Sequence, residues 1–254
     1  MTMTHDHILL LAGTHEARQL ARALSKTFPE TRLTASFAGA VSDLPDLGVP
    51  TRVGGFGGVD GLRAYLAAEA VTIIVDATHP FAAQMSRNAA AAADLPLATL
   101  LRLDRPGWTA ESGDTWQSFG TLKEAAAALP TGARVFLSVG RTDIGLFTHR
   151  TDLFGLARMI EPPSEPLPPH WQLILARPPQ AVEEELSLME THRITHLVTK
   201  NSGGTRAFAK IAAARRLSLP VFMISRPDLP EAETAGSVDE MIALVKGHLG
   251  PVAD

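Results

Sequence analysis

Short apolar runs of about six residues recur along the chain, and each is followed by a polar or glycine-containing turn and then by a stretch rich in alanine and leucine. This alternation of strand-like and helix-like segments is typical of βαβ units around a parallel sheet. In the first part of the chain it predicts strands at His7–Ala12, Arg32–Phe37, Val71–Ala77 and Leu97–Leu103, and helices at Ala17–Thr27, Asp60–Glu69 and Phe81–Ala93.

The periodicity fades from Pro106 to Phe119, which we interpret as a connection, and a second series follows. It predicts strands at Arg134–Val139, Leu153–Met159, Gln172–Ala176, His196–Thr199 and Val221–Ser225, and helices at Leu122–Leu129, Gln180–His192, Thr205–Leu217 and Val238–Leu249. We therefore expect an α/β protein with two Rossmann-like parallel-sheet domains, residues 1–105 and 106–254. We also expect a cleft between them at the carboxyl ends of the strands, where open α/β sheets bind ligands.

Composition narrows the chemistry. The 254 residues include no cysteine, which excludes thiol catalysis, iron–sulfur clusters and thiolate zinc sites. The net charge of −4 without blocks of like charge predicts no nucleic-acid or membrane partner. The longest apolar stretch, Ile8–Ala12, is far shorter than the roughly 20 residues of a membrane span, and no basic segment precedes it. We expect a cytoplasmic protein.

Two loops in the first series follow strands and carry groups suited to a nucleotide. Gly13-Thr14-His15-Glu16-Ala17 lies between a strand and a helix, so its amides would face an anion; the alternative is an ordinary turn capped by Thr14. It is not a GxGxxG motif, and Gln19 stands where a zincin motif has its second histidine, so we expect no metal. The second strand ends at Ser36 without an acidic residue, which favours NADP over NAD.

Three further loops follow strands. Asp76-Ala77-Thr78-His79-Pro80-Phe81-Ala82 combines a carboxylate, a hydroxyl, an imidazole and an aromatic ring, although a lone histidine here is more often structural. Thr199-Lys200-Asn201-Ser202-Gly203-Gly204-Thr205 suits an anion or an amide, or is a glycine-rich turn capped by Thr205. Ser138-Val139-Gly140-Arg141-Thr142 adds a fixed positive charge.

As a set, these segments resemble the precorrin-6A reductase family of cobalamin biosynthesis, together with Lys210-Ile211-Ala212-Ala213-Ala214 and the ending from Val221 to Pro227. The resemblance runs in order from about Ile8 to Pro227. It implies an enzyme that uses NADPH to reduce one double bond of precorrin-6A, giving precorrin-6B. The cofactor would supply the hydride, and the protein would hold the nicotinamide against a ring carbon and exclude water.

The resemblance also implies roles for particular residues. Cofactor contacts are expected at Gly13, Thr14, His15, Glu16, Ser36, Thr78, His79, Phe81, Thr142, Asn201, Ser202, Gly203 and Gly204. The carboxylates of the tetrapyrrole would pair with Arg141, Arg206 and Arg226. His79, Lys210 or bound water would supply the proton that the adjacent ring carbon gains. Other enzymes of the pathway are candidate partners.

Two other classes of protein are compatible with the residues. One is a two-lobed α/β module that binds an anion without catalysing a reaction on it. The other is a generic NADP-dependent reductase of carbonyl compounds, which would normally have a Tyr-x-x-x-Lys pair. The chain's single tyrosine, Tyr65, is followed at that spacing by Glu69.

Overall fold

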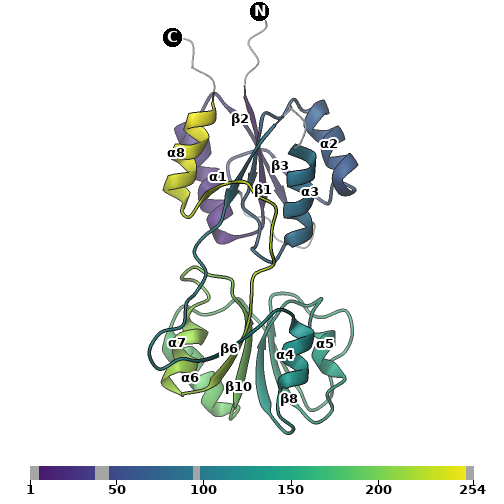
Figure 1. The fold of residues 1–254 in the computed structure, drawn as a ribbon, viewed down its shortest axis with the longest axis vertical. Coiled ribbons are helices and arrows are strands. Elements are labelled where there is room, and N and C mark those ends of the chain that lie inside the picture. Colours follow the sequence, from purple (N-terminus) through teal and green to yellow (C-terminus); the bar gives the residue numbers. More distant parts are fainter. Residues whose placement is uncertain (1–5, 38–45, 94–97, 250–254) are drawn as a thin grey trace, which may run out of the picture. The chain divides into compact units, whose positions relative to one another are not determined.

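A computed structural model of the chain describes residues 6–37, 46–93 and 98–249 (Figure 1). Ala38, Gly39 and Leu97, which belong to the predicted loop and strand segments, lie outside the described residues. The chain forms two compact units, the first made of residues 1–105 and 228–254 and the second of residues 106–227. In the described part of the chain, no helix combines the length and apolar composition that crossing a bilayer requires.

The first unit contains a six-stranded sheet in which every neighbouring pair of strands is parallel. The strand order is β3-β2-β1-β4-β5-β12. Its elements are β1 (His7–Ala12), α1 (His15–Thr27), β2 (Arg32–Phe37), β3 (Thr51–Val53), α2 (Gly58–Ala68), β4 (Ile73–Asp76), α3 (Ala83–Ala93), β5 (Thr99–Leu103), β12 (Glu233–Ala235) and α8 (Val238–His248).

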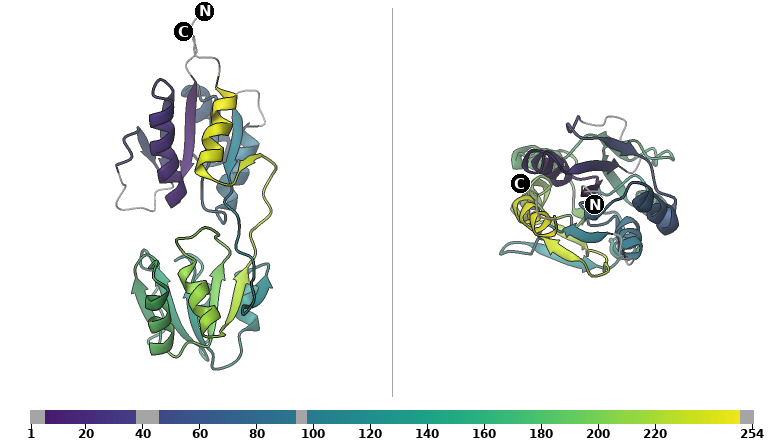
Figure 2. Two further views of the ribbon diagram at one scale, coloured as in Figure 1. Left: turned by 90° about the vertical axis from the view of Figure 1, so that its left-hand side faces the viewer. Right: turned by 90° about the horizontal axis from the view of Figure 1, so that it is seen from above.

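Helices cover both faces of this sheet, as Figures 1 and 2 show. Successive residues of a strand point to opposite faces, and β1 is apolar throughout because both of its faces are buried. Ile8 and Leu10 pack with α1 and α8, whereas Leu9 and Leu11 pack with α2 and α3. The continuous apolar run in the sequence is thus explained by a central strand of a sheet covered on both faces.

The second unit repeats this architecture with a second all-parallel sheet, in the order β9-β8-β7-β10-β11-β6. Its elements are β6 (Thr115–Phe119), α4 (Leu122–Ala128), β7 (Arg134–Ser138), α5 (Gly145–Thr148), β8 (Phe154–Met159), β9 (Gln172–Leu175), α6 (Val182–Thr191), β10 (His196–Lys200), α7 (Ala209–Arg216) and β11 (Pro220–Ile224). Helices α6 and α7 pack together over one face, where Phe136, Leu197 and Ile211 are buried.

In each sheet, the direction in which successive strands are added across the sheet reverses once. After building β1, β2 and β3 outward, it returns to place β4 on the other side of β1, and β10 takes the same place beside β7. Such switch points, at the carboxyl ends of the strands, are where open α/β sheets bind ligands. The fold class expected from the sequence, two Rossmann-like parallel-sheet units, is confirmed.

One predicted boundary needs correction. The change of unit after Arg105 coincides with the prediction, but residues 228–254 belong to the first unit and not to the C-terminal domain. The reason is that β12 extends the first sheet beside β5, while Met241 and Val245 of α8 join the core around α1. Strand β6, in the segment interpreted as a connection, occupies the corresponding edge of the second sheet.

Candidate functional site

The first and third predicted loops lie side by side at the switch point of the first sheet. They follow β1 and β4, which are neighbours in the sheet. The hydroxyl group of Thr14 caps α1 by accepting a hydrogen bond from the amide of Ala17 (3.0 Å) and donates to the carbonyl oxygen of Ala77 (3.0 Å). Apart from its two chain neighbours, no atom of the described residues lies within 4 Å of a Cβ placed on Gly13. The amide end of α1 therefore has open space beside it, which suits a phosphate group.

A buried ion pair fixes the loop after β4. Asp76, 2% exposed, accepts hydrogen bonds from the amide (3.2 Å) and hydroxyl (2.7 Å) of Thr78 through Oδ1. Its Oδ2 accepts from Nε of Arg102 (3.3 Å), which lies beside it in the sheet. Nη1 of Arg102 donates to the carbonyl oxygen of Pro230 (2.8 Å) in the returning segment. Thr78 is therefore held in place by the carboxylate of Asp76, which is itself paired with Arg102.

Four other predicted site residues also belong to this edge. Nδ1 of His79 accepts a hydrogen bond from the amide of Phe81 (3.2 Å), and the two rings lie 5.9 Å apart. Glu16, in the first turn of α1, pairs with Arg105, the last residue before the chain enters the second unit (2.9 Å). His15 begins α1 in the same loop. The imidazole and the aromatic ring at the end of β4 are therefore neighbours, as expected.

Arg52 belongs to this edge of the sheet and was not singled out in the sequence. It lies opposite Ser36 in the register of β2 and β3, and its Nη1 donates to the hydroxyl oxygen of Ser36 (2.8 Å). Its guanidinium group also donates to the carbonyl oxygens of Gly54 (3.0 Å) and Gly55 (3.1 Å) and lies over the ring of Phe56, 3.8 Å from the centroid. The sequence offered no local signal for Arg52, because β3 is only three residues long and its pairing with β2 is a tertiary contact.

The glycine loop of the second unit is held by Trp108. The amide of Trp108 donates to Oδ1 of Asn201 (2.8 Å), whose Nδ2 donates back to the Trp108 carbonyl oxygen (2.9 Å). The indole N–H donates to the carbonyl oxygen of Gly204 (2.7 Å). Gly203 and Gly204 have positive φ angles of 65° and 71°, which glycine adopts without strain. The side chain of Asn201, expected to contact a cofactor, is therefore engaged in shaping the loop.

The predicted cationic residues differ in their surroundings. Arg206 is exposed and has no hydrogen-bond or ion-pair partner among the described residues. Arg141 is about half exposed and pairs with Glu161 (2.8 Å). Nε of Arg226 donates to the carbonyl oxygen of Asn201 (3.0 Å) and its Nη2 to that of Ser202 (3.3 Å). Arg206 and Arg141 can reach a ligand in solution, whereas Arg226 supports the glycine loop.

Around the second switch point, the loop after β7 is exposed. Thr142 is exposed beside Arg141, and the next residue, Asp143, accepts a hydrogen bond from Nζ of Lys200 at the end of β10 (2.6 Å). This ion pair links the two loops that flank the switch point, because β7 and β10 are neighbours. The loop predicted from Gly140 onward therefore does lie beside the loop that follows β10.

The position of Lys210 does not support its predicted role as a proton donor. Lys210 is 2% exposed inside the second unit, and its Nζ donates to the carbonyl oxygen of Ala207 (2.8 Å). Burial, and secondarily the positive charge of Arg158, lowers the pKa of Lys210 to about 7, although Glu185 acts in the opposite direction. Burial at 2% exposure argues for an indirect role of this ammonium group over direct contact with a ligand.

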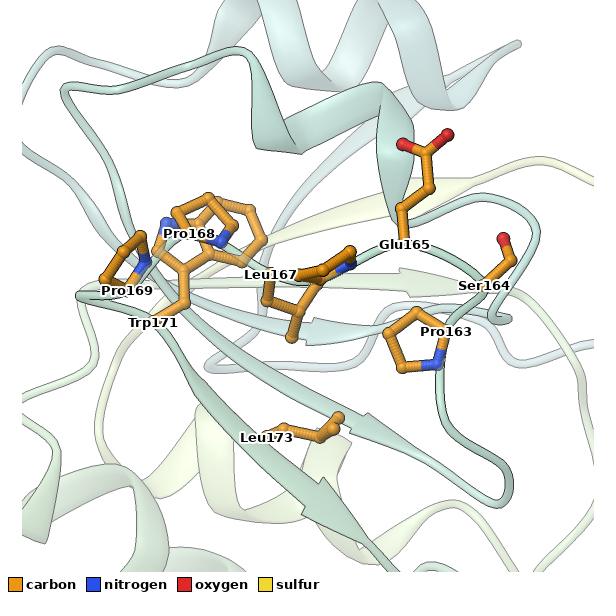
Figure 3. A pocket seen from close by; sticks show the side chains of 9 residues that line it. Pro163, Ser164, Glu165, Leu167, Pro168, Pro169, Trp171 and Leu173 are labelled. Carbon is orange, nitrogen blue, oxygen red and sulfur yellow. The ribbon is translucent and has the colours of Figure 1, made fainter.

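A separate cavity of about 440 Å³ lies in the second unit, lined by the proline-rich segment from Pro163 to Pro169 with Trp171 and Leu173 (Figure 3). None of the predicted site residues lines it. The candidate site therefore consists of the loops at the switch point of each unit, and this cavity is not part of it.

Strand order, parallel direction and loop placement define the class of protein: two Rossmann-type α/β units, each with polar loops at its switch point. Residues 7–246 match the family described as "Precorrin-6x reductase CbiJ/CobK". The chain belongs to this family and is an oxidoreductase.

Relatives of known name agree with this assignment. The precorrin-6A reductase of Rhodococcus erythropolis is 49% identical over 241 residues, covering 94% of this chain and 96% of the relative. The precorrin-6A reductase of Rhodobacter capsulatus is 41% identical, covering 95% and 96% of the two chains. A solved structure named "CobK precorrin-6A reductase" has a TM-score of 0.88 at 42% identity, covering 96% of this chain and 97% of the other.

Proposed function

We propose that the protein uses NADPH to reduce a double bond of precorrin-6A, giving precorrin-6B in cobalamin biosynthesis, and that it does so in the cytoplasm. The family and its named relatives support the reaction and the use of a nicotinamide cofactor. They do not favour a non-catalytic binding module or a carbonyl reductase.

The choice of NADPH depends on the Ser36–Arg52 pair. In Rossmann folds the end of the second strand faces the adenosine ribose, and an acidic residue there selects NAD, whereas a nearby arginine accommodates the 2′-phosphate. Here the strand ends in a hydroxyl group bonded to a guanidinium. An arginine has five N–H donors, and the bonds to Ser36, Gly54 and Gly55 leave two without a partner among the described residues. These two donors suit a phosphate.

The remaining parts of the first unit fit the rest of the cofactor. The open space beside Gly13 and the amide end of α1 suit the pyrophosphate. The loop from Thr78 to Phe81 follows β4 at the switch point, so it would lie beside the nicotinamide, with His79 as the residue that can give a proton to the ring carbon next to the one reduced. NADPH, when bound, supplies the hydride.

The second unit would hold the tetrapyrrole and would make cofactor contacts of its own. Arg141 and Arg206 have exposed guanidinium groups for the substrate carboxylates. Thr142 and the loop from Asn201 to Gly204 would contact the cofactor, with Trp108 and Arg226 fixing the loop conformation. Other enzymes of the pathway are candidate partners in this proposal.

The test compares NADPH with NADH in the presence of precorrin-6A, following the loss of nicotinamide absorbance. Arg52→Gln should raise the KM for NADPH by about 10- to 100-fold, because a hydrogen bond to a charged group contributes about 1.5–3 kcal/mol, and should leave the KM for NADH nearly unchanged. Ser36→Asp should favour NADH. Arg22→Gln, an exposed arginine on α1, is the matched control.

Equal use of NADPH and NADH by the unmodified protein would refute the argument from Ser36 and Arg52. If neither coenzyme were oxidised in the presence of precorrin-6A, the proposed reaction itself would be excluded.

A further inference from the structure

Lys210 brings a positive charge into the interior of the second unit without a carboxylate of its own. The nearby carboxylate, Glu185, is 0% exposed and already accepts hydrogen bonds from both Nη atoms of Arg158 (2.6 and 2.9 Å). Burying an ammonium group costs free energy, and an apolar side chain of similar length would avoid that cost. Because Lys210 carries this cost, a role for its charge is expected in the contacts that the ammonium group makes.

Two contacts of the Lys210 ammonium group, to the Ala207 carbonyl oxygen and to the Trp108 ring, lie next to the glycine loop. Its Nζ donates to the carbonyl oxygen of Ala207 (2.8 Å), three residues beyond Gly204. It also lies 5.0 Å from the centroid of the Trp108 ring, within the range of a cation–π interaction. Trp108 is 9% exposed and its other side packs edge-on against Phe208 (6.0 Å between centroids).

Trp108 is hydrogen-bonded directly to the glycine loop. Its backbone makes two hydrogen bonds with the side chain of Asn201, and its indole N–H donates to the carbonyl oxygen of Gly204. The first and last residues of the loop are therefore both attached to Trp108. A shift of the indole ring would move both ends of the loop.

The loop has little freedom to adjust on its own. Gly203 has a φ of 65°, and a Cβ at this position would overlap the carbonyl oxygen of Pro106. Arg226 donates to the carbonyl oxygens of Asn201 and Ser202. Because the loop is packed this closely, its conformation depends on the groups that surround it.

We propose that Lys210 is a positioning residue, whose charged ammonium group holds Trp108 and the Ala207 carbonyl and thereby keeps the loop from Asn201 to Gly204 in the conformation that receives the cofactor. The inference rests on the proposed function for the identity of the ligand. Lys210 itself acts without touching the ligand.

The charged groups around Lys210 make this positioning depend on pH. Arg158 of β8 and Glu185 of α6 are the charged residues that act on it. Burial and Arg158 lower the pKa of Lys210 to about 7, against the influence of Glu185, so the ammonium group loses its proton as the pH rises through neutrality. The cation–π contact with Trp108 is then lost, and the loop is held less firmly.

The kinetic test compares Lys210→Met with Lys123→Met, the same replacement at an exposed position on α4. At about pH 6, Lys210→Met should raise the KM for NADPH about tenfold, in keeping with the loss of a desolvated cation–π contact, while kcat at saturating NADPH changes less than about twofold. The difference in KM from the unmodified protein should diminish as the pH rises through about 7. If both the KM for NADPH at about pH 6 and the hydrogen exchange of the Trp108 indole N–H were unchanged, the proposal would be contradicted.

A second measurement reports on the loop without any ligand. Hydrogen exchange of the Trp108 indole N–H, followed by NMR and assigned by its absence in Trp108→Phe, should be at least about tenfold faster in Lys210→Met, because this proton forms the bond to Gly204. Unchanged exchange would overturn the role of Lys210. Faster exchange with an unchanged KM would instead show that the loop does not belong to the cofactor site, which is a failure of the proposed function.

Discussion

Replacing Lys210 by methionine should also change the stability of the second unit, in a way that depends on pH. Lys210 is enclosed by α6, α7 and the underlying strands, and methionine fills a similar space without a charge. The variant loses the hydrogen bond to Ala207, which lowers its free energy of unfolding, and no longer buries a cation, which raises it. Comparing one variant at two pH values isolates the net effect of the charge on Lys210, since the packing contribution is the same at both.

The size of the pH effect follows from the pKa of Lys210. Burial lowers it from 10.5 to about 7 in the folded protein, so between these values the unfolded chain binds more protons and the stability of the unmodified protein rises with pH. Near pH 6 the burial of Lys210 as a cation costs about 5 kcal/mol, and near pH 9, where it is buried as the neutral amine, the cost of its deprotonation is about 2 kcal/mol. The stability of Lys210→Met relative to the unmodified protein should therefore fall by about 3 kcal/mol from pH 6 to pH 9.

Tryptophan fluorescence during urea unfolding measures this difference. All three tryptophans of the chain, Trp108, Trp116 and Trp171, belong to the second unit, so their emission reports on that unit alone. Lys123→Met serves as the control and should show the same stability relative to the unmodified protein at both pH values. If the relative stability of Lys210→Met changed by less than about 0.5 kcal/mol between the two, the argument from a buried, titrating lysine would be refuted.

Three further predictions concern other parts of the two units. Gly203→Ala should destabilise the second unit by about 1–3 kcal/mol in urea unfolding and raise the KM for NADPH, because its φ is positive and a Cβ has no room, whereas Gly145→Ala, with open space, should do neither. Glu185→Gln leaves Arg158 and Lys210 buried without an anion and should cost about 3–5 kcal/mol by the same assay; a loss below about 1 kcal/mol would contradict this. Burial lowers the pKa of His7 below 6.5, so the stability that neutral His7 gives the first unit is complete above that pH and is lost as the pH falls below it; the protection factors of the β1 amides, which are corrected for the intrinsic exchange rate at each pH, should fall there, and less so in His7→Gln.

Most loops of the candidate site could be predicted from the local pattern of apolar and polar residues. The loops after β1, β4, β7 and β10 could be selected because each follows an apolar run and precedes a helical stretch, and parallel strands place all such loops at one edge of their sheet. The neutral end of β2 at Ser36 was equally visible. Arg52 was not, because β3 is only three residues long and its meaning depends on pairing with β2.

The sequence by itself determined the α/β class, the polar loops that follow the strands and the change of unit after Arg105, since these depend on hydrophobic periodicity and on neighbours along the chain. Only the tertiary structure decided that β12 and α8 return to the first sheet, that Arg52 meets Ser36 and that Lys210 is enclosed beneath Trp108. Each of these depends on contacts between residues far apart in the chain. Such contacts form when whole elements pack, and the side chains involved carry no local signal of their partners.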